Sequence, residues 1–472
     1  MYSLTMNRHH CSVMLLGNAT RMAFSLGLNH SISEEQVPCL IEREQRIRIW
    51  WTIYVLDRHS LKKGTSPLVH DDDVNVDLPS DIPDDLDHEE FGDAAYLVAS
   101  VKLAEIIGQV ISKIYGRKKH QEPFLQRQQK LLISLKEWLQ SLPQHLCLST
   151  FGDGSRPQHV VYLHLQFNHC VMLATRSILL YRLVEKCGAF DSQNRDTSQK
   201  AARGDSVPTV SRAVDTLCEA CIQAARRSCL LFIQEWTQGS IPMFGFSNCP
   251  CLFASGLVLA VASQSAESSA ESSRNDNDCC FDEILEILRV MMDNGNPVAT
   301  QQHFILDKAK QAIDGSRTSN AARCSLDSGY DTPQVQGAPG TDAANPNQHV
   351  NLNPVSCSKS MDTFPTTSKP LSIVAATSDM ALPFSTTSTT SCTTPTLLPP
   401  TATGHELPPM EMQFLDQSLE DFLAKPPIDL EQLGCGAMDF GALIDGGGYR
   451  YGDGNFDNLD PLCYWPSSTW WA

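Results

Sequence analysis

Charged residues are fewer in this 472-residue chain than in an average protein: Asp, Glu, Lys and Arg make up 19% of it, against about 25% in typical globular domains. Basic residues are the scarcer sign, because 36 Lys and Arg stand against 54 Asp and Glu, a formal net charge of −18. A protein that grips nucleic acid through bulk charge needs clustered Lys and Arg. The composition therefore excludes nucleic-acid binding by overall charge.

Long hydrophobic runs are also missing. The longest, from Cys251 to Ala262, is shorter than the roughly 18 apolar residues of a membrane-spanning helix. The apolar patch from Val13 to Gly17 is too short for a secretory signal. The 17 cysteines are scattered and odd in number, unlike those of a disulfide framework. We therefore expect no membrane partner and a reducing, intracellular compartment.

Catalytic and phosphate-binding motifs are absent. Neither the glycine-rich dinucleotide pattern nor the P-loop pattern occurs. The nearest approach to a nucleophile elbow, from Gly245 to Cys249, lacks the second Gly. His405 and Glu406 lack the second His of a zinc-protease helix. The sequence therefore predicts that the chain is not an enzyme and has no catalytic residue.

Two clusters resemble metal sites in residue type only. Cys218, Cys221 and Cys229 fall in a helical pattern. Structural zinc takes four ligands, often as two C-x-x-C-like pairs, but the next two cysteines have C-x-C spacing. The acidic run 70–73 lacks the central Gly and closing Glu of a calcium loop. We expect buried core cysteines and a solvated acidic loop, with no metal or other cofactor held by this chain.

Helical patterns fill residues 1–314. Apolar residues recur every three or four positions over 13–26, and this stripe stops at Gly27, which is typical of a helix C-terminus. A second helix follows Pro38, and a third covers 97–114. Further helices are predicted over 124–141, 158–187, 209–237, 249–263, 280–292 and about 298–313. Strand alternation is nearly absent, so the predicted fold is an all-α, multi-helix domain.

Two segments of different composition follow. Residues 315–405 are rich in Ser, Thr, Pro, Ala and Asn. They bury too little apolar surface to offset the entropy of ordering, so we expect a disordered linker. Over 401–472, twelve acidic residues stand against Lys425 and Arg450 and are interleaved with Leu, Phe and Trp. This alternation is typical of amphipathic activation segments, which we expect over 406–472.

One stretch of the tail has the pattern of a short amphipathic helix. Five apolar residues share a face: Met412, Leu415, Leu419, Phe422 and Leu423. A helix this short is marginal in water by itself, but it can place these anchors in an apolar groove while its acids meet a basic rim. We expect the groove to belong to a partner. A solvated tail and a helix packed on the chain's own core are the alternatives.

The segment from Ala19 to Pro79 carries three motifs in order. They are ATRMAFSLGLNH, EREQRIRIWWTIYVLDR and GTSPLVHDDDVNVDLP. Together they resemble the regulatory middle region of fungal-specific transcription factors of the binuclear zinc-cluster type. The matching residues are Arg21, Gly27, Glu44, Arg46, Arg48, Trp50, Trp51, Asp57, Arg58, Gly64, Val69, Asp71, Asp73 and Pro79. We interpret them as structural, with the aromatic residues in the core and the arginines paired with nearby acids.

The match departs from the family pattern at three positions and in extent. Ile47 replaces the middle arginine, Ser66 stands at the loop proline and Asn29 at the histidine. In the family a binuclear zinc cluster, a basic linker and a coiled coil precede this region, and the 472 residues do not include them. The resemblance therefore implies zinc and direct DNA contact only through such an upstream domain. We expect either a truncated factor or a DNA-binding-deficient co-regulator that acts through a partner.

The resemblance and the tail together imply regulation of transcription by RNA polymerase II, in the nucleus. We expect the tail to recruit transcriptional coactivators, as an activator does, and the helical domain to restrain or tune it. The family also implies a homodimer or heterodimer. The alternative function is a metabolite-sensing helical module that binds a small molecule in an apolar pocket between helices.

Overall fold

The computed structural model describes residues 2–61, 67–82, 91–116, 120–151, 156–192, 208–245, 247–265, 271–327 and 417–424. Helices account for most of these residues. The described ranges contain no β-strand, only an isolated bridge between His30 and Asn75. The predicted all-α fold is therefore confirmed.

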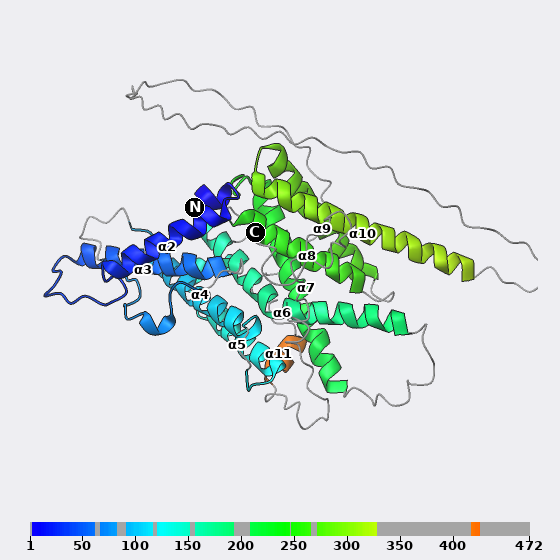
Figure 1. Ribbon diagram of the computed structural model, residues 1–472, viewed down its shortest axis with the longest axis horizontal. Helices are drawn as coiled ribbons and strands as arrows, with labels where there is room; N and C mark the ends of the chain where they lie inside the picture. The colour runs from blue at the N-terminus through cyan, green and yellow to red at the C-terminus, as the bar shows by residue number, and fades with distance from the viewer. Residues whose placement is uncertain are drawn as a thin grey trace, which may run out of the picture. The chain divides into compact units, whose positions relative to one another are not determined.

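The helices follow the chain in order (Figure 1). They are α1 (Tyr2–Thr5), α2 (His9–Ser25), α3 (Leu40–Leu61), α4 (Ala94–Ile114), α5 (Phe124–Gln140), α6 (Gln158–Ser192), α7 (Pro208–Thr237), α8 (Asn248–Ser265), α9 (Glu271–Asp293), α10 (Pro297–Asp327) and α11 (Gln417–Ala424). Short 3₁₀ turns form η1 (Asp71–Asp73), η2 (Gln144–Leu146) and η3 (Leu148–Phe151).

Helix ends differ most from the expected ones where polar residues extend a helix. α9 begins at Glu271 rather than near 280, and α10 continues to Asp327, past the change in composition at 315. Arg317 on this extension pairs with Asp278 of α9 at 3.0 Å. Such a contact between helices leaves no mark in the local periodicity. The rest of the expected linker, 328–405, lies outside the described residues.

The main core lies along α6. This helix packs against α4, α5, α7 and α8, and α8 packs in turn on α9 (Figure 1). Leu173 of α6, Phe232 of α7 and Leu288 of α9 have almost no exposed surface. Burying each such side chain contributes about 1.5–3 kcal/mol, and this contribution holds the long helices together.

A second, smaller core joins α2, α3 and α4. α2 ends at Ser25, and Gly27 follows with a φ of +65°, a left-handed conformation that glycine adopts without strain. The turn closes with a hydrogen bond of 3.0 Å from the Leu28 N–H to the carbonyl of Ala23. Leu28 thereby joins the cluster that contains Trp50 of α3, so α3 and the turn after α2 share one core.

Among the described helices, α4 is long and apolar enough in composition to cross a membrane. It packs against α3, α5 and α6, and Val101, Ala104, Ile107 and Val110 are fully buried. A helix that is buried in a protein core is also apolar on most of its sides. The contacts identify α4 as a core helix of this domain.

Candidate functional site: a docked acidic helix and a pocket between helices

Asp57 and Arg58, at the end of α3, hold the segment that follows that helix. The Asp57 carboxylate is fully buried and accepts the backbone N–H groups of Leu68 at 3.1 Å and Val69 at 3.3 Å. Arg58 donates to Asp57 at 2.7 Å and to the Val69 carbonyl at 3.0 Å. Burial raises the pKa of Asp57, against the lowering by the Leu68 N–H and by Arg58. This buried pair acts as an internal clamp on the segment.

Glu44, near the start of α3, holds the far end of the same segment. Its buried carboxylate accepts the Ser80 N–H at 3.1 Å, the Ser80 hydroxyl at 3.2 Å and the Arg48 Nε–H at 2.7 Å. Arg48 also donates to the Ser80 carbonyl at 3.0 Å. The indole N–H of Trp51 donates to the Asp77 carbonyl at 2.8 Å. The polar motif residues of α3 therefore fold the next segment back onto the helix.

The family-motif residues lie in different settings. Buried are Glu44, Trp50, Trp51, Asp57, Arg58, Val69 and Pro79. Half-buried are Gly27, Arg46 and Arg48, and exposed are Arg21, Asp71 and Asp73. Gly64 lies outside the described residues. Arg46 donates to the Leu26 carbonyl at 2.9 Å instead of pairing with an acid, so it ties α3 to the end of α2.

The acidic helix α11 lies against α5 and α7 of the same chain (Figure 1). Its side chains Leu419, Phe422 and Leu423 are 3%, 5% and 8% exposed and belong to the main core cluster. The other two expected anchors, Met412 and Leu415, lie outside the described residues. The three described anchors occupy the chain's own core, one of the alternatives that the sequence left open.

Two polar contacts join α11 to α5. Gln129 is buried, and its side-chain amide donates to the Phe422 carbonyl at 2.9 Å. Lys136 Nζ lies 3.8 Å from a carboxylate oxygen of Glu420. Neither α5 residue belongs to a motif in the sequence. The available signal was that Gln129 falls in the apolar stripe that Leu125 and Leu132 define, where a polar side chain needs a partner.

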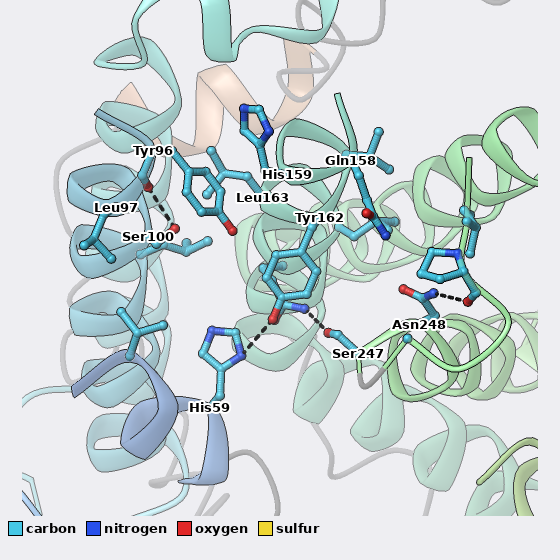
Figure 2. Close-up of a pocket in the computed structure, with 18 of the residues that line it drawn as sticks. His59, Tyr96, Leu97, Ser100, Gln158, His159, Tyr162, Leu163, Ser247 and Asn248 are labelled. Atoms are coloured by element: carbon cyan, nitrogen blue, oxygen red, sulfur yellow. Dashed lines mark hydrogen bonds between the residues drawn. The ribbon is translucent and has the colours of Figure 1, made fainter. Parts of the chain in front are cut away.

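A cavity of about 480 Å³ lies between α3, α4, α6 and the segment 240–248 (Figure 2). Figure 2 shows the rings of His59, Tyr96, His159 and Tyr162 gathered around this space. Tyr96 meets His159 edge to face with ring centroids 5.2 Å apart, and Tyr162 stacks on His59 at 6.3 Å. Burial raises the pKa of Tyr96 and of Tyr162, so both hydroxyls stay neutral at physiological pH.

One acid lies in the wall of this cavity. Glu235 of α7 is fully buried, and its Oε1 accepts a hydrogen bond of 3.0 Å from Arg156. The other oxygen, Oε2, has no hydrogen-bond partner among the described residues. The described lining residues include no Lys or Arg. No sequence motif marks the residues that line this cavity, because they come from separate segments of the chain.

The cysteines that suggested a half-complete zinc site are buried along α7: Cys218, Cys221 and Cys229. Burial raises the pKa of the Cys218 and Cys221 thiols to about 12. Both thiols are therefore protonated at neutral pH, whereas metal binding takes the thiolate. In the part of the chain that the structure describes, no group of three or more His, Cys, Asp or Glu side chains is placed to hold a metal ion.

Comparison with known proteins bears on the first part of the chain. Residues 1–143 match the fungal specific transcription factor domain. The chain is 24% identical over 220 residues to an uncharacterized transcriptional regulatory protein of Schizosaccharomyces pombe. It is 32% identical over 147 residues to the transcriptional activator protein acu-15 of Neurospora crassa. It is 28% identical over 229 residues to an ABC-transporter-regulating transcription factor of Aspergillus oryzae.

These three alignments cover 46%, 29% and 46% of this chain, but 25%, 16% and 24% of the relatives. The matched region thus spans a quarter or less of each relative's length. No solved structure matches the chain. The three sequence motifs all lie inside residues 1–143, which match the family domain, and this match confirms the resemblance. Over residues 1–143 this chain is similar to the fungal specific transcription factor domain.

Proposed function

We propose that this chain regulates transcription by RNA polymerase II in the nucleus, through contacts with other proteins. The match of residues 1–143 to the fungal specific transcription factor domain carries the proposal. The relatives include proteins named as a transcriptional activator and as a transcription factor. The net charge of −18 favours protein partners over direct DNA binding, because phosphate neutralisation needs Lys and Arg. Contact with DNA then depends on an upstream domain or on a partner.

Different segments of the chain have different roles in this proposal. The helical part, 1–314 by composition, is the regulatory domain, and 406–472 is the activation segment that recruits coactivators. The segment 315–405 links the two. Two observations support the proposal that the chain is a regulator and not an enzyme. Residues 1–143 match a transcription factor domain, and the sequence contains no catalytic motif.

Helix α11 supplies a physical link between the two parts. An amphipathic activation helix binds a coactivator by placing its apolar face in a groove. The apolar face of α11 carries Leu419, Phe422 and Leu423, and it is buried on α5 and α7. One face cannot fill two grooves at the same time. We therefore propose that the helical domain restrains the tail by occupying these anchors, and that a coactivator competes for them.

The helical domain and a coactivator can compete for α11 if its docked and released states are similar in free energy. Burial of the anchors favours docking, while fixing the backbone of α11 costs entropy that offsets much of that gain. The docked and released states are therefore close enough in free energy for a partner to shift the balance. Because domain and tail share one chain, docking is intramolecular and its strength depends on the connecting segment.

Reporter transcription from fusions to a heterologous DNA-binding domain tests the proposal. We expect 406–472 alone to activate, and the full chain to activate several-fold less because α11 is docked. Phe422→Ala should lower the activity of the isolated tail, because the largest anchor is lost. Ser418→Ala, on the exposed side of the same helix, is the matched control and should change little.

Two results would contradict the proposal. If the tail fusion and the full-chain fusion are both silent, the activation role is wrong. If the two fusions are equally active, the tail activates but the helical domain does not restrain it. Imaging of the fluorescently tagged full chain checks the nuclear location, and an entirely cytoplasmic signal under all growth conditions would exclude it.

A further inference from the structure

We propose that the cavity between α3, α4, α6 and the segment 240–248 binds an uncharged, largely aromatic small molecule that carries hydroxyl or N–H groups. This site goes beyond the proposed function. Binding is a property of the folded helical domain and does not depend on whether the tail activates transcription.

The size of the cavity fits a small organic molecule. Its volume of about 480 Å³ lies within the roughly 300–1,000 Å³ of typical small-molecule sites. Five parts of the fold contribute to it: α3, α4, α6, the end of α7 and the residues between α7 and α8. Sites of this kind commonly form between the helices of a bundle. The space is therefore large enough for a ligand of several rings.

The walls of the cavity favour a ligand with aromatic rings. The side chains of Tyr96 and Tyr162 stand on the walls with His59 and His159 (Figure 2), and aliphatic groups such as Leu97 complete them. Aromatic rings gain about 0.5–1.5 kcal/mol beyond area burial when they meet edge to face or offset-stacked. Two of the wall rings already meet edge to face at 5.2 Å. A planar ligand can extend these contacts into the cavity.

The charges of the site exclude an acidic ligand. The described lining residues include one formal charge, that of Glu235, and no Lys or Arg. Arg156 pairs with Glu235 at 3.0 Å, so the nearest cation is already matched by a buried anion. A carboxylate or phosphate moved into this wall would lose its hydration without gaining a counter-charge. A cationic ligand finds no free counter-charge either, because Glu235 is already matched by Arg156, so the ligand is uncharged.

Glu235 favours a ligand that carries a hydrogen-bond donor. Glu235 Oε2 is buried and has no hydrogen-bond partner among the described residues. A buried acceptor left unpaired costs about 1–3 kcal/mol, and more when the group is charged. A ligand hydroxyl or N–H that reaches this wall would remove that cost. Ser240 and Asn248, also in the wall, add polar groups that orient the ligand.

A matched pair of fluorescent probes tests the proposal on the purified full-length chain. N-phenyl-1-naphthylamine is uncharged and aromatic, and it carries one N–H. 8-Anilino-1-naphthalenesulfonate has the same two ring systems plus a sulfonate. Both brighten in an apolar site. We expect saturable binding of the uncharged probe, and at least tenfold weaker binding of the sulfonate.

Variants that fill the cavity test whether the uncharged probe binds at this site. Ser100 of α4 lies in the cavity wall, so Ser100→Trp should weaken binding of the uncharged probe at least tenfold. Ser112→Trp is the matched control, because Ser112 is exposed on the same helix and does not line the cavity. Circular dichroism and melting temperature confirm that each variant folds. If Ser100→Trp does not fold, Ser240→Trp, in the loop after α7, replaces it.

Three results would overturn the proposal. No saturable binding of the uncharged probe to the wild-type chain would exclude the site. Binding that survives a folded cavity-filling variant would place the probe elsewhere. Equal affinity for both probes would contradict the argument from charge. Loss of binding in Ser100→Trp, with unchanged binding in Ser112→Trp, would support the site.

Discussion

The side-chain amide of Gln129 on α5 donates a hydrogen bond of 2.9 Å to the backbone carbonyl of Phe422 on α11. The two residues are 293 positions apart in the sequence. Gln129 is 4% exposed, and a buried amide needs a partner. The Phe422 carbonyl lies in the last turn of α11, where carbonyls have no partner within the helix. One bond thus satisfies two buried groups and marks the docked position of α11.

Gln129→Ala should weaken the docking of α11. The substitution leaves the Phe422 carbonyl buried without this partner, at a cost of about 1–3 kcal/mol. Amide hydrogen exchange in 417–424 should accelerate roughly 5- to 150-fold, the range that this cost implies. Gln128→Ala is the control, because the neighbouring Gln128 donates to the Ala174 carbonyl of α6. Equal acceleration in both variants would show that the bond to Phe422 has no special part in docking.

A charge swap tests the contact between Lys136 and Glu420. Their charged atoms are 3.8 Å apart and both side chains are partly exposed, so the pair contributes about 0.2–1 kcal/mol. Lys136→Glu or Glu420→Lys alone should speed exchange in α11 modestly, because like charges then face each other. The double variant should restore the wild-type rate. The differences should shrink in high salt, which screens exposed charges. A double variant as fast as the faster single variant would argue against a direct contact.

Asp57→Ala should destabilise the N-terminal part of the helical domain strongly. Asp57 and Arg58 are 0% and 3% exposed. Removal of the Asp57 carboxylate leaves the buried Val69 N–H without its acceptor, at a cost of about 1–3 kcal/mol. It also leaves Arg58 with the exposed Asp71 as its remaining acidic partner. Asp72→Ala, in the exposed turn η1, should change stability by about 0.5 kcal/mol or less. Urea unfolding followed by tryptophan fluorescence measures both, since Trp50 and Trp51 lie in the same small core. Equal midpoints would contradict the clamp.

Alkaline pH should destabilise the fold through two buried thiols. The pKa of Cys218 and of Cys221 is about 12 in the folded chain, against a usual 9.0. Between these values the unfolded chain releases the protons and the folded chain keeps them. Stability is therefore fully present below pH 9 and falls as the pH rises from 9 toward 12. Each thiol lowers the free energy of unfolding by up to about 1.4 kcal/mol per pH unit.

Urea unfolding at pH 8 and pH 10 measures this loss. The double variant Cys218→Ala, Cys221→Ala should lose less stability over the same interval, because its unfolded chain has two fewer protons to release. The comparison is made within each variant, so a lower stability of the variant at pH 8 does not matter. Identical losses in the variant and the wild-type chain would show that folding does not raise the pKa of these thiols.

The sequence by itself determined the elements of this protein. A helix forms from contacts between residues three and four apart, so periodicity was sufficient to predict α2 to α8 and the stop at Gly27. The motif around Trp50 and Trp51 indicated the family resemblance for the same reason, since it is a continuous run. Acidic–hydrophobic alternation likewise indicated a helix near α11, because composition and periodicity are local.

Only the tertiary structure decided what those elements contact. The anchors Leu419, Phe422 and Leu423 would fit any apolar groove, and their own pattern does not say whose groove it is. The pairing of Gln129 with Phe422, and the position of Glu235 in a cavity wall, depend on how distant helices pack. Packing between residues far apart in the chain is set by shape and burial over the whole core, which no short stretch of sequence contains.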